Sequence, residues 1–234
     1  MTWLATGSWV KAYEVDFAAQ ATQDIKAGGD GPYTIDGKQW TASGSALAST
    51  LSLTNGVGLE FVSSTTGSIE MRMLMSEVPG FTTSRPWRLM LRYSNYQPNQ
   101  DFENVLMLVS SAIAGSRSLG ALRGWNAADR YFNYLGTTTL QTDIPAAHIA
   151  DNLYVVETDG GTVRSYAGVA AGAVGVLPVS TGGLVGIAQS VVTGNLESAQ
   201  VPFEDLTTVL RLGLNNSVAG NAYTVEAMRV DIGA

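Results

Sequence analysis

Glu14 and Asp16 are the first residues whose types and spacing could support catalysis. They alternate along one predicted strand, so both carboxylates would face the same side of a sheet. Retaining glycosidases need two carboxyl groups about 5–5.5 Å apart, and on a single strand the known pattern is E-x-D-x-x-E. The last acid of that pattern is replaced by Ala19 here. We therefore interpret Glu14 and Asp16 as the solvated face of a strand.

Nucleophilic catalysis and zinc chemistry find little support in the sequence. His148 is the only histidine, it follows Pro145 in a turn-like segment, and no serine sits in a G-x-S-x-G pattern. A Ser–His–Asp triad therefore has one candidate base and no recognisable nucleophile. With no cysteine, a zinc site would need three carboxylates beside that histidine. We predict no catalytic residues, no metal and no cofactor.

Calcium is the one ion that the sequence leaves open, because it needs only oxygen ligands from loops. Five aspartates in predicted loops could supply them, but they form no EF-hand or repeat pattern, and loop aspartates are mostly turn formers. These residues are Asp101, Asp129, Asp143, Asp151 and Asp159.

A candidate glycan site is predicted around Trp125, together with Asn126, Asp129 and Tyr131. An aromatic ring can stack on the apolar face of a sugar, and the Asn and Asp side chains can hydrogen-bond its hydroxyl groups. A second loop with similar composition, residues 93–102, adds Tyr96. The alternative is that these aromatic side chains cap the core at strand ends.

Composition and charge exclude several classes of partner. Of the 234 residues, 45% are hydrophobic and 14% are charged, which is below the roughly 25% charged residues of an average domain. The net charge is −7, and the 13 Lys and Arg are scattered, whereas nucleic-acid binding requires a basic patch. No stretch is long and apolar enough to insert in a membrane. The N-terminus has neither the basic nor the apolar region of a signal peptide.

The elements that would position these residues are strands, because the dominant hydrophobic period is two. In residues 68–75 and 87–93, apolar side chains alternate with charged ones, which predicts half-buried antiparallel strands. The apolar members are Ile69, Met71, Met73, Met75, Trp87, Leu89, Leu91 and Tyr93, and the charged members are Glu70, Arg72, Arg88 and Arg92. Residues 223–230 become apolar on both sides, as in a central strand.

Further strands are predicted at 13–17, 58–62, 104–110, 118–124, 130–135, 154–157, 162–166, 184–188 and 209–214. Turns are expected at 36–37, 55–56, 79–80 and 159–161, the last within a hairpin. Helix signals are confined to residues 17–26 and to single turns at 145–149 and 203–206. We predict one all-β domain over residues 1–234, with residues 1–8 as a possible N-terminal arm. Its fold class is an antiparallel two-sheet sandwich, jelly-roll or concanavalin A-like.

The order of these segments resembles that of β-sandwich virion proteins of tailed bacteriophages. Residues 9–17 and 33–40 look like the first strands of such domains, 151–166 like their central hairpin, and 210–214 with 223–232 like their last strands. The resemblance implies a jelly-roll or concanavalin-like fold and a structural or adhesive role in a virion assembled in the host cytoplasm. It transfers no functional residue.

Three functions follow as hypotheses. The first is a non-enzymatic virion structural protein, for capsid decoration or a tail or fibre, that binds itself or other virion proteins. Such assemblies are expected to be homo-oligomers with closed symmetry. The second is a lectin-like module that binds host-surface glycans. The third is a polysaccharide-degrading enzyme, for which the sequence offers no pair of convergent acids.

Overall fold

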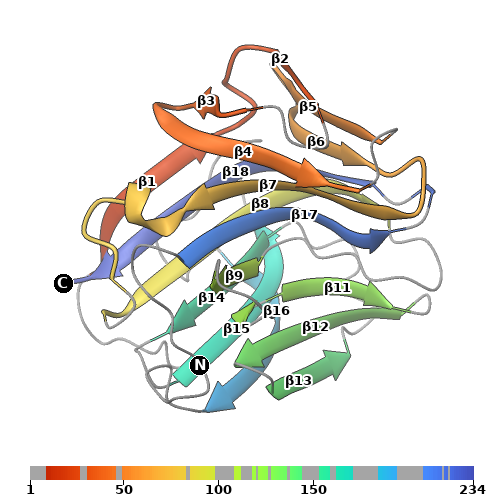
Figure 1. Ribbon diagram of the computed structural model, residues 1–234. Coiled ribbons are helices and arrows are strands. Elements are labelled where there is room, and N and C mark those ends of the chain that lie inside the picture. Colours follow the sequence, from red (N-terminus) through yellow and green to blue (C-terminus); the bar gives the residue numbers. More distant parts are fainter. Residues whose placement is uncertain are drawn as a thin grey trace.

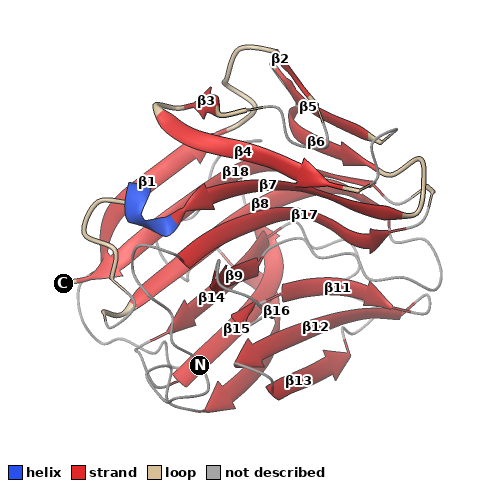
Figure 2. Ribbon diagram, in the orientation of Figure 1, coloured by secondary structure: helices blue, strands red, loops and turns tan. Residues whose placement is uncertain are grey.

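The protein is built almost entirely of antiparallel strands, which confirms the predicted two-sheet sandwich (Figures 1 and 2). The computed structural model describes residues 9–26, 31–45, 49–82, 85–97, 219, 220 and 222–234, and the strands between 108 and 217. Within these residues, the one helical element is the single 3₁₀ turn η1 (Met75–Glu77).

The first sheet has nine strands, and β18 lies between three neighbours. β18 pairs with β8 along one edge, and with β1 and β6 in succession along the other. The order of the main path is β16 (Leu184–Thr193), β15 (Thr162–Ala170), β14 (Leu153–Thr158), β8 (Trp87–Gln97), β18 (Ala222–Gly233), β6 (Gly58–Val62), β5 (Thr50–Thr54) and β2 (Gln23–Ile25), with β1 (Trp9–Asp16) beside β18.

The second sheet has six strands and lies over the first, as Figure 1 shows for β4, β7 and β17. Its order is β10 (Ser118–Leu119), β9 (Leu108–Ser111), β17 (Thr208–Ser217), β7 (Gly67–Leu74), β4 (Lys38–Gly44) and β3 (Tyr33–Ile35). A third, three-stranded sheet consists of β11 (Ala121–Trp125), β12 (Ala128–Leu135) and β13 (Thr138–Asp143). Strand β12 contacts β10, β15 and β16.

The core between the two large sheets is aromatic and aliphatic. Trp40 is fully buried and meets Phe17 edge-on at 5.8 Å between ring centroids. Phe61 and Tyr223 stack at 4.9 Å. Trp87 is also buried. Burying side chains of this size is the main favourable term in folding, at roughly 25 cal/mol per Å² of apolar surface.

The period-two pattern locates most strands correctly. The apolar residues of 68–75 and 87–93 face the core, and the predicted strand 58–62 coincides with β6. The predicted hairpin at 153–166 is formed by β14 and β15, although its turn lies outside the described residues. β18 is central, as predicted from its apolar character on both sides. Of the predicted strand 104–110, only the part from Leu108 onward lies within the described residues.

One prediction about β8 is wrong. The alternation at 87–93 predicts a half-buried strand, but Arg88, Met90 and Arg92 on its second face are only 2–4% exposed. The second face is therefore as buried as the first, and its charged side chains need partners within the protein.

The helical turns predicted for residues 17–26 are also absent. The backbone N–H groups of Phe17 and Ala18 both donate to the carbonyl oxygen of Glu226 in β18, and the Asp16 carboxylate accepts from the Ala19 N–H. Since these bonds hold the chain against the sheet, residues 23–25 go on to form β2. The helical turns predicted at 145–149 and 203–206 lie outside the described residues.

Glycines fix the turns as the sequence predicts. Asp36 and Gly37 have φ of 48° and 72° in the two-residue loop that joins β3 to β4, which is the geometry of a type I′ hairpin turn. Gly56 and Gly80 also have positive φ. Gly58 has a φ of 128°, and a Cβ there would lie 2.4 Å from the Val225 carbonyl oxygen.

We expect Gly58→Ala to lower the free energy of unfolding by about 2–4 kcal/mol, from backbone strain and steric overlap with β18. Chemical denaturation measures this. Gly56→Ala is the matched control, because its φ is also positive but nothing lies within 4 Å of its Cβ, so it should cost about 1 kcal/mol. Equal losses in the two variants would contradict the close approach.

Candidate functional site

The predicted glycan cluster lies around the hairpin formed by β11 and β12. Trp125 ends β11, while Asp129 and Tyr131 belong to β12. In the register, Trp125 pairs with Ala128, whereas Asp129 pairs with Gly124 and Tyr131 with Leu122. Because alternate residues of a strand belong to opposite faces, the position of Trp125 is on the other face of the hairpin from those of Asp129 and Tyr131.

Two members of the predicted cluster remain, Asn126 and Tyr96. Asn126 lies outside the described residues. Tyr96 lies near the end of β8, on a different sheet from the hairpin. The glycan cluster stays a prediction.

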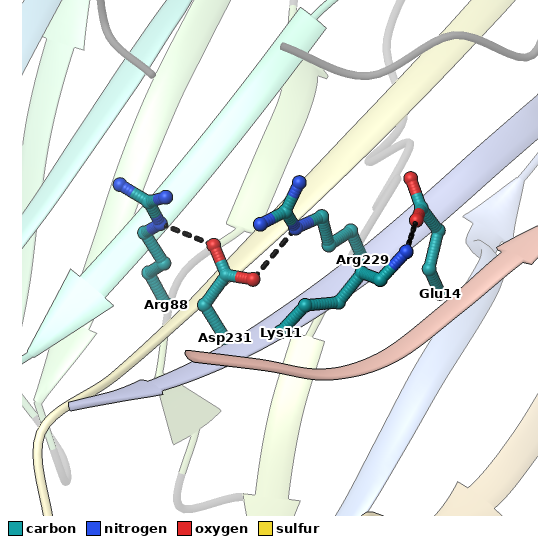
Figure 3. A network of polar contacts seen from close by, with 5 residues as sticks. All are labelled: Lys11, Glu14, Arg88, Arg229 and Asp231. Atoms are coloured by element: carbon teal, nitrogen blue, oxygen red, sulfur yellow. Dashed lines mark hydrogen bonds and ion pairs between the residues drawn. The ribbon is translucent and has the colours of Figure 1, made fainter. Parts of the chain in front are cut away.

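A charged cluster that the sequence analysis does not predict lies on the face of the first sheet that points away from the core between the two large sheets (Figure 3). Asp231, which is fully buried, accepts hydrogen bonds from two arginines. Arg88 Nε donates to Asp231 Oδ2 at 2.7 Å, and Arg229 Nε donates to Asp231 Oδ1 at 2.6 Å. One carboxylate thus bridges β8 and β18 with both of its oxygen atoms.

A second buried ion pair joins the same two strands further along. Arg92 Nε lies 2.9 Å from Glu226 Oε2, and both side chains are less than 10% exposed. Glu226 falls at a β-bulge, where the pairing of β18 with β8 shifts between Val225 and Ala227. An extra residue in one strand re-aims the side chains around it, so the bulge interrupts the alternation from which a sequence pattern would place Glu226.

The edge of this charged face is open to solvent. Lys11 Nζ lies 2.6 Å from Glu14 Oε2, with the lysine side chain 55% exposed, and the Arg88 guanidinium lies 4.8 Å above the ring of Trp9. Glu14 and Asp16 are half-buried and alternate with the buried Tyr13 and Val15. Their predicted role as the polar face of a strand is consistent with this geometry.

Buried tyrosines carry the clearest shifts in acidity among the described residues. Burial raises the pKa of Tyr223 well above its usual value, although a hydrogen bond with the backbone of Gly213 acts in the opposite direction. That bond links β18 of the first sheet to β17 of the second. Burial and the nearby Asp36 carboxylate raise the pKa of Tyr13. Both phenols therefore remain neutral, as structural groups, at physiological pH.

Two further structural features bear on metal binding and on membranes. No group of three His, Asp or Glu side chains there is arranged to hold a metal ion. No helix in that part of the chain is long and apolar enough to cross a membrane.

Comparisons with known proteins give matches to solved structures only. No protein-family model matches the sequence, and no curated protein matches it. The fold is similar to that of the CBM2 module of the evolved Dit protein of Lactobacillus casei BL23 phage J-1, with a TM-score of 0.53 and 12% sequence identity. The match covers 98% of this chain and 99% of that module. The likeness is one of fold. It bears out the resemblance to phage β-sandwich modules at that level.

Other structures match less closely. Arcelin-5, a lectin-like defense protein from Phaseolus vulgaris, has a TM-score of 0.47 and 8% identity, over 91% of this chain and 97% of arcelin-5. A protein of unknown function from Shewanella oneidensis MR-1 has a TM-score of 0.47 and 10% identity, over 100% of this chain and 90% of that chain.

We expect Asp231→Asn to lower the free energy of unfolding by about 3–5 kcal/mol, because it leaves two buried guanidinium groups without their shared anion. Glu14→Gln is the matched control at the exposed pair on the same face, where the loss should be below about 1 kcal/mol. Urea denaturation measures both. Similar small losses in the two variants would contradict a structural role for the buried cluster.

Proposed function

We propose that this chain is a non-enzymatic module of a tailed-phage virion that acts by binding, primarily through protein–protein assembly. The observation that carries the proposal is the end-to-end likeness to a phage Dit module, which leaves almost no part of either chain unmatched. A match that extends over nearly all of both chains supports a comparable architectural use. The low charged fraction suits a surface that packs against other copies or other virion proteins.

The carboxylates of the charged faces favour a scaffold over a catalyst. Asp231, Glu226, Glu70 and Glu14 each form an ion pair with a neighbouring arginine or lysine. A glycosidase keeps one carboxyl group protonated as a general acid. A carboxylate that is already bonded to a cation within the protein is not free to act as a general acid or a nucleophile, which supports a structural use of these residues.

Assembly predicts a defined oligomer or a fixed place on a particle. We expect light scattering of the purified protein to give one mass, that of a closed homo-oligomer, over a wide concentration range. Quantitative mass spectrometry of the virions should give a copy number that is a multiple of their symmetry. A strictly monomeric protein that is also absent from the virions would contradict the proposal.

Glycan binding is the second candidate, and the Dit module supports it because that module is named a CBM2 module. In this chain the candidate residues are those of the β11–β12 hairpin. We expect Trp125→Ala to weaken binding of any glycan that the wild-type protein recognises on an array by at least about tenfold, through loss of ring stacking. Tyr131→Ala tests the position on the other face of the hairpin. If the glycan site uses one face only, one of the two variants should bind as the wild-type protein does.

The control for the glycan experiment is Val10→Ser. Val10 is 57% exposed on β1, in a different sheet from the hairpin, so its replacement should leave binding within about twofold. No glycan bound by the wild-type protein, or equal binding by Trp125→Ala, would contradict a lectin-like role for this hairpin.

A further inference from the structure

The outer face of the second sheet brings two arginines together. Arg72 of β7 and Arg211 of β17 are direct cross-strand partners, and on its other side Arg72 pairs with Thr41 of β4. Directly opposed residues share one face of a sheet, with Cβ atoms about 4.5–5.5 Å apart. Like charges at such positions repel each other, so the pair needs a compensating anion.

Among the described residues, the carboxylate of Glu70 bonds Arg72 and acts on Arg211 through its charge alone. Glu70 Oε2 lies 2.8 Å from Arg72 Nε. Arg211 Nε is buried and has no hydrogen-bond partner among the described residues. Burial lowers the pKa of Arg211, Glu70 acts to raise it, and the charge of Arg72 lowers it further. The face therefore carries two guanidinium groups for one carboxylate.

Glycine at position 213 shapes this arrangement. Gly213 pairs with Glu70 across β17 and β7. A Cβ at Gly213 would lie 2.9 Å from Glu70 Cγ and 2.3 Å from the Ile69 carbonyl oxygen. The absence of a side chain lets Glu70 lie close over β17, while Arg211 Nε has no hydrogen-bond partner among the described residues.

A buried donor without a partner is unfavourable for folding. The presence of such a donor in Arg211, beside the second cation Arg72, is explained if a ligand supplies the missing anion. We propose that Arg72 and Arg211 form a binding site for the carboxylate of an acidic saccharide. The site is separate from the predicted Trp125 cluster and goes beyond the assembly role proposed above. Arginine forks bind carboxylates with two parallel hydrogen bonds, which fixes the orientation of the ligand.

The neighbouring residues fit a sugar better than an acidic protein segment. Gln39, Thr41 and Ser43 of β4 occupy the outward positions of that strand, where Trp40 and Ala42 between them are buried. Their amide and hydroxyl groups can both donate and accept hydrogen bonds, which matches the hydroxyl groups of a sugar ring. Leu74, 42% exposed at the end of β7, offers an apolar contact.

The proposal is tested by titration calorimetry of the full chain with short oligogalacturonates at low ionic strength. We expect binding that weakens with added salt. Arg72→Met and Arg211→Met should each raise the Kd by about tenfold or more, as for loss of a charge-assisted hydrogen bond. Arg211→Lys should also weaken binding, because it keeps the charge but loses the fork. Fully methyl-esterified oligomers, which lack the carboxylate, should not bind.

Two controls separate a specific site from a loss of charge or of folding. Lys26→Met removes the same charge from an exposed position beside β2, in the other sheet, and should change the Kd by less than about twofold. Arg211→Met should keep or raise the Tm, because it removes an unpartnered buried donor. A lower Tm would show that Arg211 stabilises the free protein and would contradict the proposal.

Three results would overturn the acidic-saccharide site. They are no binding of oligogalacturonate by the wild-type protein, binding that is unchanged in both arginine variants, and equal, arginine-dependent binding of polyglutamate. The last result would assign the site to acidic protein segments. Since these measurements use the isolated chain, their failure leaves the oligomer mass and the virion copy number as independent tests of the assembly role.

Discussion

The structure depends on the burial of β18 on both of its faces. One face supplies Met228, Val230 and Ile232 to the core, and the other carries Arg229 and Asp231. A charge in such a position is tolerated only when it is paired and hydrogen-bonded. Because the Asp231 carboxylate bonds arginines from both β8 and β18, it fixes the register of the two strands around which the first sheet is ordered.

Because the ion pairs of the first sheet are closed within the protein, the second sheet is the candidate surface for recognition. On β7 and β17 two arginines again lie near one carboxylate, but Glu70 bonds Arg72, and Arg211 Nε has no hydrogen-bond partner among the described residues. The two faces therefore differ in whether every arginine in them is bonded to a carboxylate of the protein. Rigid sheets that present polar side chains without moving suit a module that binds, because little ordering remains to oppose association.

Local sequence predicts the strands well because their signals are local. The alternation in 68–75 and the Asp36–Gly37 turn depend only on neighbouring residues, and both are correct. What lies against a strand is not encoded nearby. The burial of Arg88 and the loss of the helical turns at 17–26 both depend on β18, more than a hundred residues away in sequence. The pairing of Arg72 with Arg211 is hidden for the same reason, and the Trp125 cluster remains a prediction.

Hydrogen exchange of the full chain, resolved by residue, tests most directly the claim that β18 is the locked centre of the fold. The account predicts that the amides of β18 and β8 exchange last, at the rate of global unfolding, while those of the edge strands β2 and β3 exchange earlier through local opening. Exchange of the β18 amides as early as those of β2 would contradict it, and would show that the buried ion pairs do not hold the sheet together.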